Sequence, residues 1–165
     1  MIYFTTFIFT LLLSHIARAV PACDDAASPE DLYDLTNDDF QLPLLTTYKV
    51  TWDGTYNNPN GNTNGVACSD GPYGLASTYP QFHNFPNFPN LGGAFDTRHG
   101  SSNCGKCWRL SSTQTGRWIY LTAIDAAGTG FNIAKDAFLA LGGSMDTGSL
   151  EAYADPVPPS LCGFL

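Results

Sequence analysis

Residues 117–125, Arg-Trp-Ile-Tyr-Leu-Thr-Ala-Ile-Asp, form the stretch that decides the fold class. β-Branched and aromatic residues fill this stretch, and such side chains fit the pleated surface of a strand. Both alternating sets of side chains are largely apolar: Trp118, Tyr120, Thr122 and Ile124 on one face, and Ile119, Leu121 and Ala123 on the other. A run that is apolar on both faces is buried on both, so we predict a central strand of a sheet.

Further strands and one helix are expected on either side of this segment. Alternating patterns at residues 48–52, 106–111 and 150–157 predict three more strands. Asn132 can cap a short helix and Gly142 can end it. The apolar side of this helix would consist of Ile133, Ala137, Phe138 and Leu141.

Long segments rich in Asn, Gly and Pro separate these elements. Residues 57–65 read as a turn-forming loop, and residues 80–93 as an irregular loop. We expect the apolar residues of the second loop to pack against the body of the domain; these are Phe82, Phe85, Phe88 and Leu91. Short strands, long loops and a short helix predict a mainly β protein, a small β-barrel with helical additions.

The cysteines indicate disulfides rather than a metal or redox site. There are five, Cys23, Cys68, Cys104, Cys107 and Cys162. A single CxxC at residues 104–107, with no second one, is a poor match to a zinc or thioredoxin-like site. We therefore expect structural disulfides among the last four, for which three pairings are possible, and no metal or cofactor. Trp108 would pack in the core beside the disulfide of Cys107.

The N-terminal part divides into two segments ahead of the domain. Residues 2–13 are almost wholly apolar, and Ala17 and Ala19 provide small residues before a cleavage site, so residues 1–19 read as a signal peptide. A membrane anchor is the alternative, but the run is short for a span. Residues 20–45 hold seven acidic and no basic residues, which indicates an acidic tail or pro-segment. Residues 46–165 would be the folded domain, and Cys23 would be lost with a pro-segment, pair with another chain or stay free.

The charge balance excludes one class of partner. The chain has 15 acidic and 7 basic residues and a net charge of −8. Phosphate backbones are bound by basic surfaces, so we expect no nucleic-acid partner. We also expect a monomer without stable membrane association, and the signal peptide predicts that it is secreted.

Taken together, several motifs resemble the cerato-platanin family of secreted fungal proteins. In order they are VTWDGTY (50–56), GVACSDGPYGLAS (65–77), YPQF (79–82), FPNFPNLGG (85–93), NCGKCWRL (103–110), AIDAAGTGFNI (123–133) and a lone Cys162. The resemblance covers about residues 49–163, which is nearly the whole domain, and implies a double-psi β-barrel with one or two short helices, like the first domain of expansins. It also implies two disulfides, Cys68–Cys104 and Cys107–Cys162.

The resemblance further implies a function. Family members are extracellular or associated with the cell wall, bind chitin and N-acetylglucosamine oligomers, can elicit plant defence, and in some cases loosen cellulosic material without hydrolysis. The matching binding residues here are Asp125, Ala126, Ala127, Gly128, Gly130 and Asn132, with Asp53 and Tyr56 as a second element. This chain has Ala126-Ala127 where the family usually has Ser-Gly, so one hydroxyl is lost.

Two of these residues also have a purely structural interpretation. Asp125 can accept backbone N–H groups in its own turn, and Asn132 can simply cap the helix. Related inverting endoglucanases use two aspartates; Asp125 matches one, and the remaining candidates, Asp96 and Asp155, are expected to be solvated. We therefore expect no enzyme and no catalytic residues. The alternatives are a weak polysaccharide-cleaving enzyme and a surface-active, self-assembling wall protein.

Overall fold

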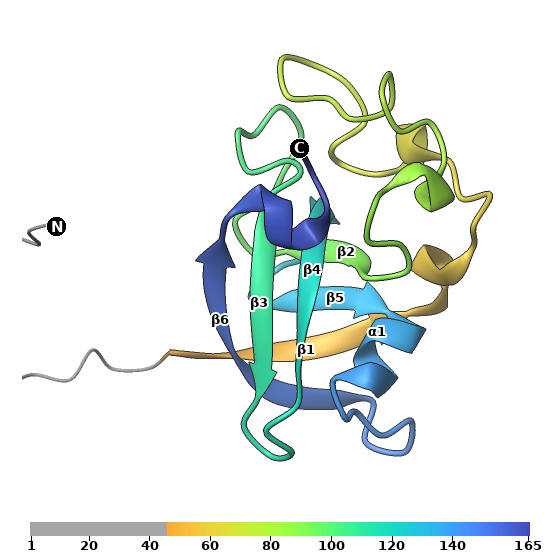
Figure 1. The fold of residues 1–165 in the computed structure, drawn as a ribbon. Helices are drawn as coiled ribbons and strands as arrows, with labels where there is room; N and C mark the ends of the chain where they lie inside the picture. Colours follow the sequence, from red (N-terminus) through yellow and green to blue (C-terminus); the bar gives the residue numbers. More distant parts are fainter. Residues whose placement is uncertain (1–45) are drawn as a thin grey trace, which may run out of the picture. The chain divides into compact units, whose positions relative to one another are not determined.

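The expected central strand is present as β4, Trp118–Ala126, in a computed structural model that describes residues 46–165 (Figure 1). Residues 121–124 of β4 are fully buried, as predicted from apolar side chains on both faces. The expected signal peptide, the acidic segment and Cys23 lie outside the described residues. Within residues 46–165, no helix is long and apolar enough to cross a membrane.

Six strands close into a barrel around β4. The order is β1-β5-β2-β4-β3-β6, with β6 returning to β1. The strands are β1 Thr47–Asp53, β2 Leu91–Ala94, β3 Cys107–Ser112, β4, β5 Phe131–Ala134 and β6 Ser149–Val157. The β1–β5 and β2–β4 pairs are parallel and the other four are antiparallel. The mainly β barrel expected from the sequence is therefore confirmed.

Short helices complete the domain. The α-helix is α1, Lys135–Ala140, and four 3-10 helices are described: η3 Gly54–Asn57, η4 Thr63–Gly65, η5 Phe82–Asn84 and η6 Pro159–Cys162. Figure 1 shows the loops of residues 58–90 above the barrel and at its upper right, and α1 at its lower right. These loops, drawn in yellow and light green, are long connections. The small core of the barrel alone would not hold them in one conformation.

The start of the predicted helix was wrong. Asn132 does not cap α1 but lies inside β5, where it pairs with Thr51 of β1. The helix begins at Lys135, and Ala134 precedes it without a side-chain cap. Lateral pairing with a strand 81 residues away outweighs the local capping preference of Asn. The predicted end is confirmed, because Gly142 has a φ of +95° and its N–H bonds to the Leu139 carbonyl.

A second local prediction was also wrong. Residues 91–94, Leu-Gly-Gly-Ala, form strand β2, although the loop was expected to run to residue 93. Glycine is a poor strand former, but β2 is hydrogen-bonded between β4 and β5 and is fully buried. The packing expected for the apolar residues of this segment is confirmed: Phe82, Phe85 and Leu91 are buried, and Phe88 is partly buried.

Aromatic packing and two disulfides hold the barrel together. The buried ring of Trp108 packs edge-on against Phe131, with centroids 5.5 Å apart, as expected for a core residue. The disulfides Cys68–Cys104 and Cys107–Cys162 confirm the implied pairing. The first ties a loop to the segment before β3, and the second ties β3 to η6. Disulfides are typical of exported proteins.

Candidate functional site

A groove of about 440 Å³ lies where β4 ends and β5 begins, beside β1. The end of β4, the loop that follows it and the start of β5 supply seven of its nine lining residues, and β1 supplies the other two. Its lining consists of Lys49, Thr51, Ala126, Ala127, Gly128, Thr129, Gly130, Phe131 and Asn132. Five of the residues expected to bind sugar are thus brought together: Ala126, Ala127, Gly128, Gly130 and Asn132.

The Asn132 amide is oriented by Thr51. The Thr51 hydroxyl lies 3.1 Å from Asn132 Oδ1 and 3.2 Å from the Phe131 carbonyl oxygen, so it can donate to either. The parallel register of β1 and β5 places these residues opposite each other. With the amide oxygen turned toward Thr51, the amino group of Asn132 is the part left to donate to a ligand.

Two glycines shape the groove in different ways. A Cβ at Gly130 would lie 2.1 Å from the Lys49 carbonyl oxygen, so the close approach of the loop to β1 requires glycine. A Cβ at Gly128 would meet no atom within 4 Å. The barrel therefore does not need glycine at position 128, and the missing side chain there leaves the groove open.

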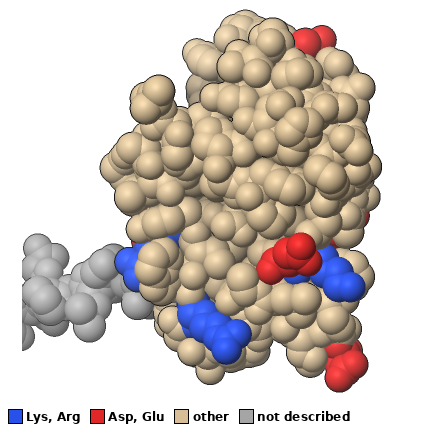
Figure 2. Space-filling view, turned by 45° about the vertical axis from the view of Figure 1, so that its right-hand side comes forward, with Lys and Arg blue, Asp and Glu red and all other residues tan. Residues whose placement is uncertain are grey.

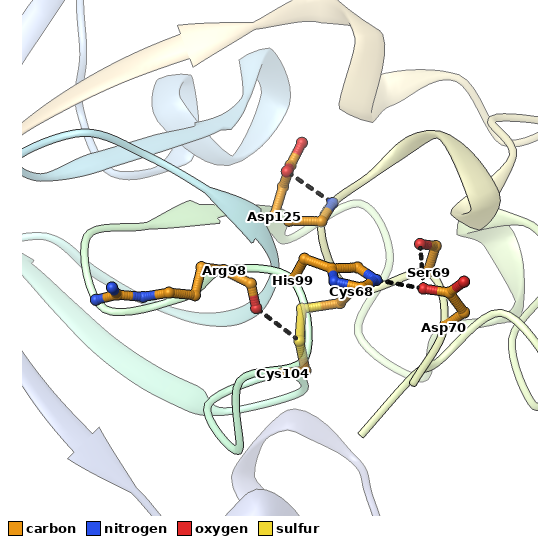
Figure 3. Close-up of polar contacts among 8 residues, drawn as sticks. Cys68, Ser69, Asp70, Arg98, His99, Cys104 and Asp125 are labelled. Atoms are coloured by element: carbon orange, nitrogen blue, oxygen red, sulfur yellow. Dashed lines mark hydrogen bonds and ion pairs between the residues drawn. A yellow bond between two sulfur atoms is a disulfide. The ribbon is translucent and has the colours of Figure 1, made fainter. Parts of the chain in front are cut away.

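Asp125 lies next to the groove in the chain but is not part of its lining. Its Oδ1 accepts hydrogen bonds from the backbone N–H groups of Ala67, at 2.9 Å, and Ala126, at 2.8 Å. Its Oδ2 accepts the Tyr56 hydroxyl at 2.9 Å. Figure 3 shows the Asp125 carboxylate directed at the segment that leads into Cys68. The carboxylate thus holds both its own turn and a distant loop.

Tyr56 is a buried donor to this carboxylate. Its side chain is 5% exposed. Burial raises the pKa of Tyr56 well above its usual value, and the negative charge of Asp125 and the hydrogen bond to it raise that pKa further. The phenol therefore remains a protonated donor at neutral pH.

The remaining carboxylates lie elsewhere. Asp53 was expected to bind sugar together with Tyr56. It instead accepts the Thr55 N–H at 2.7 Å and caps η3, and it does not line the groove. Asp96 was expected to be solvated, but its side chain is only 19% exposed and accepts from Lys106 Nζ at 2.8 Å. Asp155 is exposed on β6, as expected.

Four groove residues were missed by sequence reasoning: Lys49, Thr51, Thr129 and Phe131. Lys49 and Thr51 reach the groove through the pairing of β1 with β5, which no local pattern reveals. Lys49 is the one charged residue of the lining. Among residues 46–165 no group of three His, Cys, Asp or Glu side chains is placed to hold a metal ion.

Several known fungal proteins are similar to this chain. Allergen Asp f 15 of Aspergillus fumigatus is 42% identical over 158 residues, covering 93% of this chain and 96% of that protein. The crystal structure of cerato-platanin 2 from M. perniciosa superposes with a TM-score of 0.68 at 36% identity, covering 72% of this chain and all of that one. The solution structure of the fungal elicitor cerato-platanin superposes with a TM-score of 0.64 at 33% identity, covering 69% and 95%.

The sequence also matches the cerato-platanin family as a whole. The match runs over residues 48–164, which is most of the chain and nearly all of the described part. The barrel order, the disulfide pairing and this match agree with one another. The chain belongs to the cerato-platanin family.

Proposed function

We propose that this protein is secreted and binds chitin or N-acetylglucosamine oligomers in the groove without cleaving them. The observation that carries the proposal is the composition of the groove. An oriented amide at Asn132, hydroxyls at Thr51 and Thr129, and an open stretch of backbone at residues 127–130 line it. Sugar hydroxyls and acetamido groups need donors and acceptors of this uncharged kind. Cellulosic wall material, which offers hydroxyls but no acetamido groups, is a second ligand for the same groove.

The carboxylates support a non-hydrolytic role. Glycosidases place two carboxyl groups across the scissile bond, roughly 5–9.5 Å apart. No carboxylate lines the groove. Asp125, the one match to the catalytic aspartates of related enzymes, accepts three hydrogen bonds from the protein itself. We therefore assign it to positioning the loop.

The family relationship also supports activity as an elicitor of plant defence. The surface-active alternative finds less support, because it relied on exposed phenylalanines. Phe82 and Phe85 are 2% exposed, and Phe88 is partly buried. The described part of the chain therefore offers no exposed phenylalanine patch at these positions for assembly at an interface.

Calorimetric titration of the full chain with N-acetylglucosamine hexamer tests the proposal. Asn132→Ala removes the donor and leaves Thr51 its bond to the Phe131 carbonyl, so we expect affinity to fall about three- to tenfold. Gln114→Ala, an amide exposed in the turn after β3, serves as the matched control and should bind like the unmodified protein. Equal affinity in both variants would exclude the groove as the site.

A reducing-end assay on the same samples separates binding from cleavage. We expect no new reducing ends during the titration. Reducing ends that appear with the unmodified protein and vanish in Asp125→Asn would overturn the non-hydrolytic assignment and make the protein a polysaccharide-cleaving enzyme.

A further inference from the structure

A second surface, away from the groove, is unusually poor in charge. From residue 54 to residue 95 the sequence contains one acidic residue, Asp70, and no Lys or Arg. Asp70 Oδ1 is in hydrogen-bond contact with Nε2 of His99. Figure 2 shows that side of the molecule: its upper part is almost free of charged side chains, and Lys, Arg, Asp and Glu gather below. Exposed Asn side chains take the place of charges here.

Two segments of this region are joined side by side. Asn62 and Gln81 form a bridge, the Phe82 N–H donates to the Gly61 carbonyl at 2.9 Å, and the His83 N–H donates to the Pro59 carbonyl at 3.1 Å. The joined segments expose five asparagine side chains, which we call the amide face: Asn58, Asn60, Asn62, Asn64 and Asn84.

The amide face rests on a rigid base. The Phe82 ring is buried beneath it, and a Cβ at Gly61 would lie 2.3 Å from that ring. The chain therefore packs directly on the ring at Gly61, and only glycine allows this approach. A loop held in this way presents its side chains without a large loss of entropy on binding.

The orientation of the amides is set by the loop itself. Asn58 Oδ1 accepts the Asn60 N–H at 3.0 Å, and Asn62 Oδ1 accepts the Asn64 N–H at 2.9 Å. The oxygens of both side chains are therefore used within the turns. Both residues are exposed, and no hydrogen bond within residues 46–165 uses their amino groups, so these groups remain available as donors.

We propose that the amide face attaches the protein to the surface of solid chitin, separately from the groove. Chitin is uncharged. Contact between chitin and an uncharged protein surface therefore removes no charged group from water without giving it a partner. The acetamido carbonyls of chitin are strong acceptors that match the available amino groups, whereas cellulose has hydroxyls but no such carbonyls. The inference rests on the proposed function for the class of ligand; the attachment surface is additional to the groove.

Depletion of the full chain from a suspension of powdered chitin tests the inference. Asn62→Asp and Asn58→Asp keep the oxygen that holds each turn but replace the donor with a charged acceptor. We expect each to weaken binding about tenfold, since a hydrogen bond is lost and a charge faces an uncharged polymer. Gln114→Glu adds the same charge in the turn after β3 and should bind normally. Binding of the unmodified protein should not fall in about 1 M salt.

The outcomes separate this inference from the proposed function. If Asn62→Asp loses solid chitin but still binds the soluble hexamer like the unmodified protein, the two surfaces are distinct, as proposed. If the hexamer does not bind at all while Asn58→Asp and Asn62→Asp still lose solid chitin, only the groove proposal fails. If both aspartate variants bind solid chitin normally, or if Gln114→Glu loses it equally, the inference about the amide face is wrong.

Discussion

At the scale of single residues, the carboxylate of Asp125 joins parts of the chain that lie far apart in sequence. It accepts from Ala67 in a loop, from Ala126 in β4 and from Tyr56 in η3. Tyr56 is buried, whereas Asp125 is partly exposed. Removing the carboxylate would therefore leave a buried donor without a partner, which is more costly than the loss of an exposed hydrogen bond.

We predict that Asp125→Ala lowers the free energy of unfolding by about 2–4 kcal/mol. Asp125→Asn should cost less, because the amide oxygen can still accept from Ala67 and Ala126. Urea unfolding followed by fluorescence measures both. Asp155→Ala, an exposed aspartate on β6, is the control and should change stability by less than about 0.5 kcal/mol. A similar small change for Asp125→Ala would show that the three bonds are dispensable.

Tyr56 makes the folded protein less stable as the pH becomes alkaline. Its pKa is higher in the folded than in the unfolded protein, because burial and Asp125 disfavour the phenolate. The contribution of Tyr56 to stability is fully present below the pKa that it has in the unfolded chain. Above about pH 10 the unfolded chain releases the phenol proton before the folded protein does. Stability then falls as pH rises toward the folded pKa, by at most about 1.4 kcal/mol per pH unit.

Urea midpoints measured across the alkaline range test this sign. The unmodified protein should lose stability more steeply above about pH 10 than Tyr56→Phe, which has no proton to release at that position. Below that pH Tyr56→Phe should be the less stable of the two, because it lacks the bond to Asp125. Parallel curves for the two proteins would mean that the Tyr56 phenol titrates alike in both states.

At the scale of elements, the loop between β4 and β5 combines a glycine that the fold requires with one that we propose to face the ligand. We predict that Gly130→Ala lowers the melting temperature clearly, at a cost of about 1–3 kcal/mol, because its Cβ would collide with the Lys49 carbonyl. Gly128→Ala should fold almost normally and weaken sugar binding, because it adds a methyl group to the groove. Thermal unfolding and hexamer titration distinguish the two. Equal melting temperatures would contradict the assigned roles.

Sequence patterns predicted the long elements well and the short ones poorly. β1, β3, β4 and β6 have alternating side chains, so their existence could be predicted, and their ends differ from the expected ends by only one residue. β2 and β5 have four residues each and depend on neighbours at both sides, which local propensity does not encode. Asn132 was therefore assigned to a helix cap.

The candidate site shows the same division between local and distant information. The stretch from Ala126 to Asn132 is continuous in sequence, so family resemblance could identify it as one binding loop. Lys49 and Thr51 come from the other side of the parallel pair and could not be found without the register. Asp125 and Tyr56 were grouped with the binding residues, but they contact each other rather than the groove.

At the scale of the whole domain, two disulfides constrain the described part of the chain. They close loops with sequence separations of 36 and 55. We predict that Cys68→Ser/Cys104→Ser and Cys107→Ser/Cys162→Ser each cost about 2–4 kcal/mol, with little difference between them, because closure entropy grows slowly with loop length. Urea unfolding of the two double variants measures this. A loss below about 1 kcal/mol in either would show that packing alone fixes that loop.

The central claim is that the groove between β1, β4 and β5 binds acetylated amino-sugar oligomers without cutting them. The most direct measurement is an NMR titration of the ¹⁵N-labelled full chain with N-acetylglucosamine hexamer, with the hexamer followed in the same tube. We predict saturable shifts at Gly128, Gly130 and Asn132, smaller shifts at Asp125, and an intact hexamer. No shift in the groove at millimolar sugar would contradict the claim of binding, and cleavage of the hexamer would contradict the claim of a non-hydrolytic role.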